Sequence, residues 1–159
     1  MAGGEGEIIT ELFVYGTLKR GQCRQSLWPR KPTRVSESFI CGRLYDLGPY
    51  PAIRVDGDDA METHGFDLDW IAGELWTFHR GDMPATLAVL DEIEQTNQPG
   101  RRNLYDHVLV RAYERPRSAT SQLTLVYQYS DAYGLDHSLR VRPYFGEDVV
   151  SWPAEPAAR

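Results

Sequence analysis

Two short stretches of the sequence combine residue types that can move protons and hold negative charge. The first is the acidic run from Asp91 to Glu94, at the end of a segment with helical spacing. The second runs from Tyr15 to Leu18, where Gly16 directly follows a strand-like run and Thr17 adds a hydroxyl. A carboxylate held away from water can act as a general acid or base near neutral pH. Consecutive N–H groups in a glycine turn can bind a carboxylate or an oxyanion.

The acidic run does not lie on one face of the helix predicted over residues 82–96. With about 100° per residue and Leu87 at zero, the other apolar residues of the helix fall between roughly 200° and 320°, so the apolar arc runs from there back to Leu87. Glu94 falls at ~340°, inside this arc, whereas Glu92 falls at ~140°, on the opposite face. An unpaired carboxylate aimed at the core has a raised pKa, as a base working near neutrality requires. From the wheel alone, a Glu94 that reaches solvent or pairs with an arginine stays open.

Strands are expected around these two stretches. Asp82 can cap the helix, Pro84 suits its first turn, and the stretch from Asn97 to Gly100 ends it. β-forming residues predict strands over 8–15, 36–47, 50–55, 70–79, 104–113 and 123–129. Because strands and one main helix do not alternate regularly, a doubly wound sheet is disfavoured. We expect an α+β fold with a mixed or antiparallel sheet, curled into a barrel.

Composition limits the class of protein and its partners. The 159 residues suit one domain over 1–159, with residues 1–7 as a flexible leader and about 131–159 as an irregular tail. The formal net charge of -6 argues against nucleic acid or an anionic membrane as the main partner. Cys23 and Cys41 match neither a disulfide framework nor a zinc site, and the four histidines lack the spacing of a helical metal site. We expect a cytoplasmic protein with no metal and no membrane span; its oligomeric state stays open.

Several motifs occur in the order that the γ-glutamylcyclotransferase-like superfamily shows, which includes the AIG2-like proteins. The matching stretches are residues 13–21 (FVYGTLKRG), 42–53 (GRLYDLGPYPAI), 73–76 (GELW) and 90–94 (LDEIE), then Tyr105 with Val108 and Val110, and Val126 with Tyr127. The sequence therefore resembles this family over about residues 12 to 130. One departure is Gln95, where the family usually has glycine after the glutamate, so we expect a longer or differently shaped turn there.

The resemblance implies a small mixed β-barrel or curled sheet with flanking helices, and it implies site residues. The catalytic glutamate of the family corresponds to Glu94, and its substrate loop corresponds to Tyr15, Gly16, Thr17 and Leu18. Tyr105 and Tyr127 are candidate substrate-binding residues and could equally be core aromatics; Tyr144 is a weaker candidate for the pocket wall.

The implied reaction cyclises a γ-glutamyl group of a small-molecule substrate to 5-oxoproline and releases an amine or amino acid. The substrate supplies the nucleophile, so the scheme needs no cofactor. Two alternatives stay open: an enzyme on γ-glutamylamines or on a γ-glutamyl protecting group, and a non-catalytic binding module that keeps the cavity.

Overall fold

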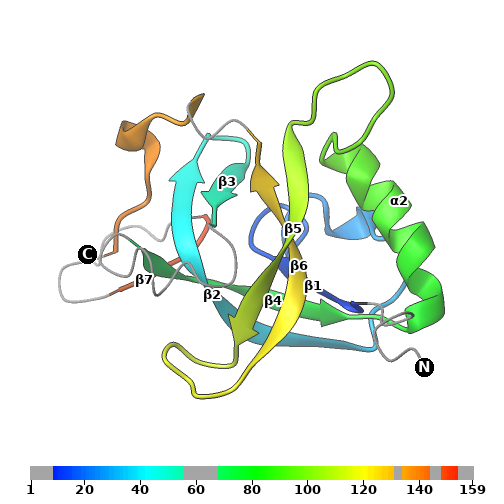
Figure 1. The fold of residues 1–159 in the computed structure, drawn as a ribbon, viewed down its shortest axis with the longest axis horizontal. Coiled ribbons are helices and arrows are strands. Elements are labelled where there is room, and N and C mark those ends of the chain that lie inside the picture. The colour runs from blue at the N-terminus through cyan, green and yellow to red at the C-terminus, as the bar shows by residue number, and fades with distance from the viewer. Residues whose placement is uncertain (1–8, 56–67, 131–133, 144–147, 154–159) are drawn as a thin grey trace, which may run out of the picture.

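The computed structural model describes residues 9–55, 68–130, 134–143 and 148–153 (Figure 1). Within these ranges it contains seven strands, one α-helix and three short 3-10 helices. The strands are β1 (Glu11–Val14), β2 (Arg34–Asp46), β3 (Pro51–Arg54), β4 (Asp69–Thr77), β5 (Tyr105–Tyr113), β6 (Ser121–Tyr129) and β7 (Val149–Val150). The helices are α2 (Met83–Ile93) and the 3-10 turns η1 (Gln25–Leu27), η2 (Arg80–Asp82) and η4 (His137–Leu139).

Five strands close into a barrel. Their order is β2-β5-β6-β1-β4, and β4 pairs again with β2 to complete the circle. The β1–β6 pair is parallel and the other pairs of the circle are antiparallel, so the barrel is mixed. β3 extends the sheet beside β2, and β7 extends it beside β4. This confirms the expected α+β fold with a small mixed barrel, and α2 lies along one side of it (Figure 1).

Alternation along β1 separates two cores. Phe13 and Tyr15 pack into a cluster that fills the barrel. Leu12 and Val14 point the other way, into a cluster that also holds Leu90 of α2. Because successive side chains of a strand face opposite sides, β1 lines both cores. The glycine loop at residues 15–18 follows β1 directly in the sequence.

Close packing against β1 explains one glycine of β4. A Cβ atom on Gly73 would lie 2.6 Å from both the Phe13 ring and the Val14 carbonyl. Neither neighbour can give way without moving β1, so a larger residue at position 73 would push the β1–β4 pair apart.

The helix begins and ends differently from its prediction. The Asp82 side chain makes no capping bond, because η2 leads directly into α2 and keeps Asp82 in helical geometry. The predicted cap is therefore wrong, and the Asp82 carboxylate instead lies 3.5 Å from the Arg30 Nε. Pro84 does sit in the first turn. The helix ends at Ile93, so Glu94 is its C-cap residue.

The six predicted strands correspond to β1 through β6, with β1 shorter than expected. The segment expected to be an irregular tail contributes, in its described residues, η4 and the strand β7, which pairs in parallel with β4. The expected leader at 1–7 and Tyr144 lie outside the described residues.

Candidate functional site

A pocket opens between the end of β1, the C-terminal end of α2 and the start of β5. Its empty space is about 740 Å³, open mouth included. The sequence-predicted site residues all line it: Glu94, Tyr15, Gly16, Thr17, Leu18, Tyr105 and Tyr127. The remaining lining residues are Leu12, Phe13, Val14, Arg24, Trp28, Tyr50, Pro51, Leu90, Ile93, Gln95 and Leu104. The fold thus brings together residues from six separate stretches of the chain.

Glu94 is the single carboxylate among the described residues that line this pocket. It is half-buried, and within the described part of the chain its carboxylate makes no hydrogen bond or ion pair. Burial raises the pKa of the Glu94 carboxyl from its ordinary value of 4.5 to about 7, against the opposing effect of the nearby Arg24 charge. Glu94 is therefore partly protonated and partly ionised at neutral pH.

The turn after Glu94 is a Schellman-type helix end. The Thr96 N–H donates to the Asp91 carbonyl at 2.7 Å, and the Gln95 N–H donates to the Glu92 carbonyl at 3.3 Å. This motif requires a left-handed residue after the C-cap, and Gln95 supplies it with a φ of 53°. Gln95 thus holds a conformation that glycine adopts more readily. This is the structural consequence of having Gln95 at the position where we expected glycine from the resemblance.

The glycine loop presents three unpaired N–H groups. The N–H groups of Gly16, Thr17 and Leu18 make no hydrogen bond within the described ranges, whereas the Gly16 and Thr17 carbonyls accept bonds from Lys19 and Arg24 at 3.1 and 2.8 Å. The Thr17 side chain is buried, with 7% of its surface exposed. Three neighbouring donors at a pocket wall can hold a carboxylate or an oxyanion.

Contact with Pro51 leaves no room for a side chain at position 16. A Cβ atom at position 16 would lie 2.7 Å from the Cγ and 2.8 Å from the Cδ of Pro51. The Pro51 ring is rigid, so a side chain at position 16 would displace the loop from β3.

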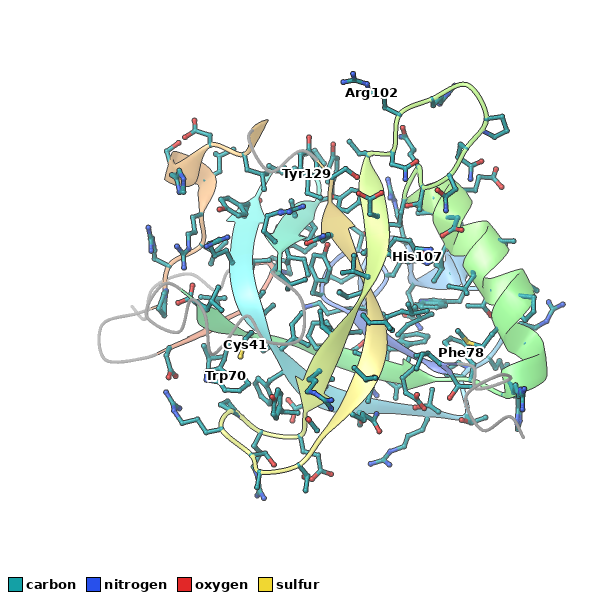
Figure 2. All side chains as sticks on the ribbon, viewed as in Figure 1. Cys41, Trp70, Phe78, Arg102, His107 and Tyr129 are labelled. Carbon is teal, nitrogen blue, oxygen red and sulfur yellow. The ribbon has the colours of Figure 1, made fainter. Side chains whose placement is uncertain are left out.

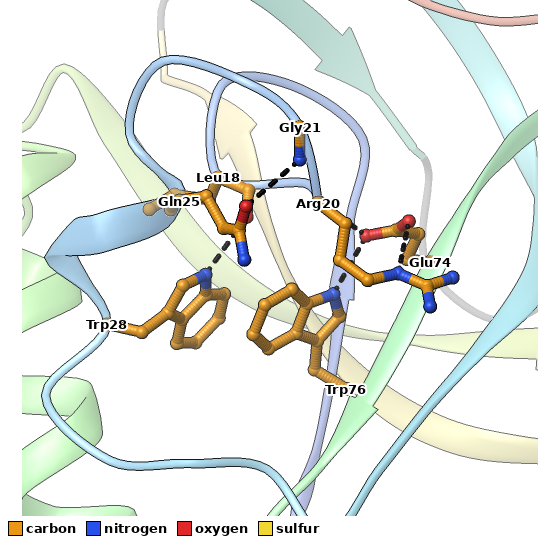
Figure 3. Close-up of polar contacts among 7 residues, drawn as sticks. All are labelled: Leu18, Arg20, Gly21, Gln25, Trp28, Glu74 and Trp76. Atoms are coloured by element: carbon orange, nitrogen blue, oxygen red, sulfur yellow. Dashed lines mark hydrogen bonds and ion pairs between the residues drawn. The ribbon is translucent and has the colours of Figure 1, made fainter.

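Two anchors hold the loop in place (Figure 3). The Trp28 indole donates to the Leu18 carbonyl at 2.9 Å and stacks on Trp76 at 4.4 Å and 12°. The Glu74 carboxylate accepts the Arg20 N–H at 2.9 Å, the Arg20 Nε at 3.1 Å and the Trp76 indole at 3.0 Å. Both anchors use groups other than the three free N–H groups, so the loop is fixed while those donors stay available.

Three of the four tyrosines that line the pocket donate their hydroxyl protons within the structure. Tyr105 donates to the Pro51 carbonyl at 2.6 Å, Tyr15 to the Tyr127 carbonyl, and Tyr127 to the Asp91 carboxylate at 2.6 Å. Burial is the main cause that raises the pKa of each phenol; neighbouring charge adds to it, and for Tyr127 so does the hydrogen bond to Asp91. All three therefore stay neutral at physiological pH. Tyr105 and Tyr127 are therefore both pocket-lining and structural.

Sequence reasoning missed Arg24, Trp28 and Glu74. Trp28 and Arg24 lie in the long segment between β1 and β2, which has no periodicity to assign them to a face. Glu74 belongs to a stretch that carried the family resemblance, and that was the available signal for it.

Neither cysteine is among the residues that line this pocket. Cys41 is half-buried opposite Trp70 in the β2–β4 pair (Figure 2). Cys23 is exposed, and the two cysteines form no disulfide. Burial raises the pKa of the Cys41 thiol to about 12, so it is not a ready nucleophile. In the residues that the structure covers, no group of three His, Cys, Asp or Glu could hold a metal ion. No helix in those ranges is both long and apolar enough for a membrane span.

Comparison with known proteins gives a family match over most of the chain. The model of the family described as "Gamma-glutamyl cyclotransferase, AIG2-like" matches residues 12–144. No curated protein matches the sequence.

Solved structures show the same fold at low sequence identity. An AIG2-like protein of Mus musculus has a TM-score of 0.52 and 17% identity, with 84% of this chain and 83% of that chain covered. A protein of Arabidopsis thaliana has a TM-score of 0.53 and 16% identity over 91% of this chain and 83% of that one. YkqA of Bacillus subtilis has a TM-score of 0.53 and 18% identity over 77% of this chain, which spans 36% of YkqA. At these identities the likeness concerns the fold.

Proposed function

Because this chain belongs to the AIG2-like gamma-glutamyl cyclotransferase family, we propose that it cyclises a γ-glutamyl group to 5-oxoproline and releases an amine or amino acid. One observation carries the proposal: the half-buried Glu94 carboxylate shares a pocket with the N–H groups of Gly16, Thr17 and Leu18, and none of these groups has a hydrogen-bond or ion-pair partner among the described residues. The first group can move protons, and the second can hold negative charge.

The reaction is an intramolecular aminolysis. The α-nitrogen of the γ-glutamyl group attacks its own δ-carbonyl carbon, a five-membered lactam forms, and the bond to the leaving nitrogen breaks. Two protons leave the α-ammonium group and two arrive on the leaving nitrogen, which departs as an ammonium ion, so no water or other reactant is consumed. Holding the γ-glutamyl chain of the substrate in a bent conformation removes much of the entropic part of the activation barrier.

Glu94 carries these protons. In its ionised form it takes a proton from the α-ammonium group, and in its protonated form it gives one to the leaving nitrogen. Its pKa of about 7, raised by burial, lets one carboxyl perform both steps near neutral pH.

The N–H groups of the loop hold negative charge in the same scheme. They can bind the α-carboxylate of the substrate and stabilise the oxyanion on the attacked carbonyl. Loss of one donor of this kind typically raises a barrier by about 2.7–4 kcal/mol. The two anchors at Trp28 and Glu74 keep the donors in place before substrate arrives, which is the condition for such stabilisation.

The test is release of 5-oxoproline from a panel of γ-glutamyl dipeptides and γ-glutamylamines. Glu94→Gln keeps the shape of the side chain and removes the base, and we expect its turnover to fall by about 100-fold or more. Glu92→Gln is the matched control, because Glu92 is exposed and does not line the pocket; its turnover should equal that of the native protein.

Folding of both variants is checked by circular dichroism. Equal turnover by the native protein and Glu94→Gln would contradict the role of Glu94. Absence of turnover on the whole panel, together with binding of panel members, would favour the non-catalytic binding module. A cytoplasmic location and a small γ-glutamyl compound as the partner stay predictions from the sequence.

A further inference from the structure

Arg24 is the one basic residue among the described residues that line the pocket, and the chemistry proposed above does not use it. Its backbone N–H donates to the Thr17 carbonyl at 2.8 Å, which ties Arg24 to the glycine loop. Its side chain is half-exposed, as is that of Glu94, whereas Tyr15 in the same pocket is buried.

The charge of Arg24 acts on other groups of the same pocket: it lowers the pKa of Glu94 and of Tyr105, which line the pocket with it.

The Arg24 guanidinium makes no hydrogen bond or ion pair within the described residues. Other arginines differ in this respect: Arg20 pairs with Glu74 and Arg30 with Asp82. Arginine at a pocket wall presents a planar set of donors that matches a carboxylate in a two-point geometry. Such a group next to a largely apolar wall is suited to an anionic ligand.

The γ-glutamyl group brings one carboxylate, and the N–H groups at residues 16–18 are able to hold it. Arg24 then meets an anion only if the substrate carries a second one. The leaving group extends from the nitrogen that Glu94 protonates. Because Glu94 and Arg24 line the same pocket and both are partly exposed, a group that extends from this nitrogen toward solvent can meet Arg24.

We propose that Arg24 forms a second anion subsite, which binds a carboxylate on the leaving group. The preferred substrates are then γ-glutamyl amino acids or peptides whose leaving amine carries a carboxylate near the reacting nitrogen, rather than γ-glutamylamines without one. This inference rests on the proposed cyclotransferase function and names its substrate class.

The experiment compares two substrates that differ in one group: γ-glutamylalanine and its neutral γ-glutamylalaninamide. The native protein should favour the acid in kcat/KM by about tenfold or more, which is the usual effect of a hydrogen-bonded charge pair. Arg24→Gln should raise KM for the acid by about the same factor, with kcat nearly unchanged, and should leave the amide within about twofold. Arg24→Lys should restore part of the preference, since it keeps the charge and loses the planar geometry.

Lys31→Gln is the matched control, because Lys31 is an exposed cation of the same β1–β2 segment that does not line the pocket; its acid preference should equal the native one. Two results would overturn the subsite. An equal loss for acid and amide would assign Arg24 to the α-carboxylate, and no loss for either would leave it without a role in binding.

A binding measurement distinguishes failure of the proposed cyclotransferase function from failure of the anion subsite. If the native protein releases no 5-oxoproline from either compound, calorimetric titration of both into the native protein and Arg24→Gln decides the matter. Tighter binding of the acid that disappears in Arg24→Gln supports the anion subsite without catalysis. Equal affinity for acid and amide, or no binding of either, overturns it.

Discussion

Replacing Glu94 by glutamine should stabilise the folded protein above neutral pH while it removes the proposed base. Burial raises the pKa of Glu94 from 4.5 to about 7 in the folded state. The folded protein therefore binds this proton more tightly than the unfolded chain does, and its stability falls as the pH rises between those two values. Below about pH 4.5 the carboxyl is protonated in both states and contributes no penalty.

The magnitude follows from the two pKa values. Their difference corresponds to a loss of roughly 3 kcal/mol in the free energy of unfolding at pH 8. This figure is an upper bound, because the side chain is half-buried and partly solvated. Glutamine carries no charge, so Glu94→Gln removes this penalty. The free energy of unfolding of the variant should exceed that of the native protein by about 1–3 kcal/mol at pH 8 and by little at pH 4.5.

The assay is urea unfolding of the native protein, Glu94→Gln and the control Glu92→Gln at pH 4.5, 6, 7 and 8. The advantage of Glu94→Gln should grow with pH and level off above about pH 8, whereas Glu92→Gln should follow the native protein throughout. A stability difference that does not change with pH, or a variant less stable than the native protein at pH 8, would refute the claim that Glu94 is held without a partner.

Three further changes test the surroundings of Glu94 and the loop. Gln95→Gly should raise the free energy of unfolding by up to about 1 kcal/mol, because glycine adopts the positive φ of this position without strain; a lower thermal midpoint would contradict it. Tyr127→Phe removes the bond to the Asp91 carboxylate and should cost about 1.5–3 kcal/mol in urea unfolding, with no further loss when Asp91→Asn is added. Trp28→Phe keeps an aromatic ring but loses the bond to the Leu18 carbonyl, so it should cost about 1 kcal/mol of stability and lower kcat/KM for 5-oxoproline release; unchanged kinetics would mean that the loop needs no such anchor.

The local elements of this fold could be predicted from the sequence, because alternation and helical spacing are local signals. β1 to β6 and α2 correspond to the predicted segments, although β1 is shorter than predicted and α2 ends at Ile93. The strand β7 could not be found in this way, since two residues carry no period and their pairing with β4 is a long-range contact. The missing Asp82 cap has a similar cause, because the preceding 3-10 turn that sets its backbone is not encoded in the capping pattern.

The same distinction between local and long-range signals decides which site residues could be predicted. Glu94 and the loop at residues 15–18 could be found because each belongs to a short motif with its own chemistry. Arg24 could not, because it lies in an irregular segment and reaches the pocket only through the path of the chain between η1 and the loop. The pocket position of all the predicted residues is a property of the structure, whereas their roles in catalysis and binding stay predictions until turnover is measured.

A carboxylate at a helix end normally turns toward water, so the inward position of Glu94 needs a cause in the backbone. The helix ends at Ile93, but the Glu94 N–H still donates to the Leu90 carbonyl at 2.8 Å, so Glu94 keeps the helical phase that the wheel assumed. On either side, side-chain bonds fix the chain to the sheet: the Asp91 carboxylate accepts from Tyr127, and the Thr96 hydroxyl donates to the Tyr105 carbonyl at 2.6 Å.

These two bonds lie three residues before Glu94 and two residues after it, and each joins the helix end to a different strand of the barrel. Rotating the helix end so that the Glu94 backbone faces outward would require breaking one of them, at a cost of about 1–3 kcal/mol, which is comparable to the penalty of keeping the carboxylate buried. The raised pKa of Glu94 is therefore maintained by the attachment of α2 to β5 and β6, and weakening that attachment should lower both the pKa and the turnover together.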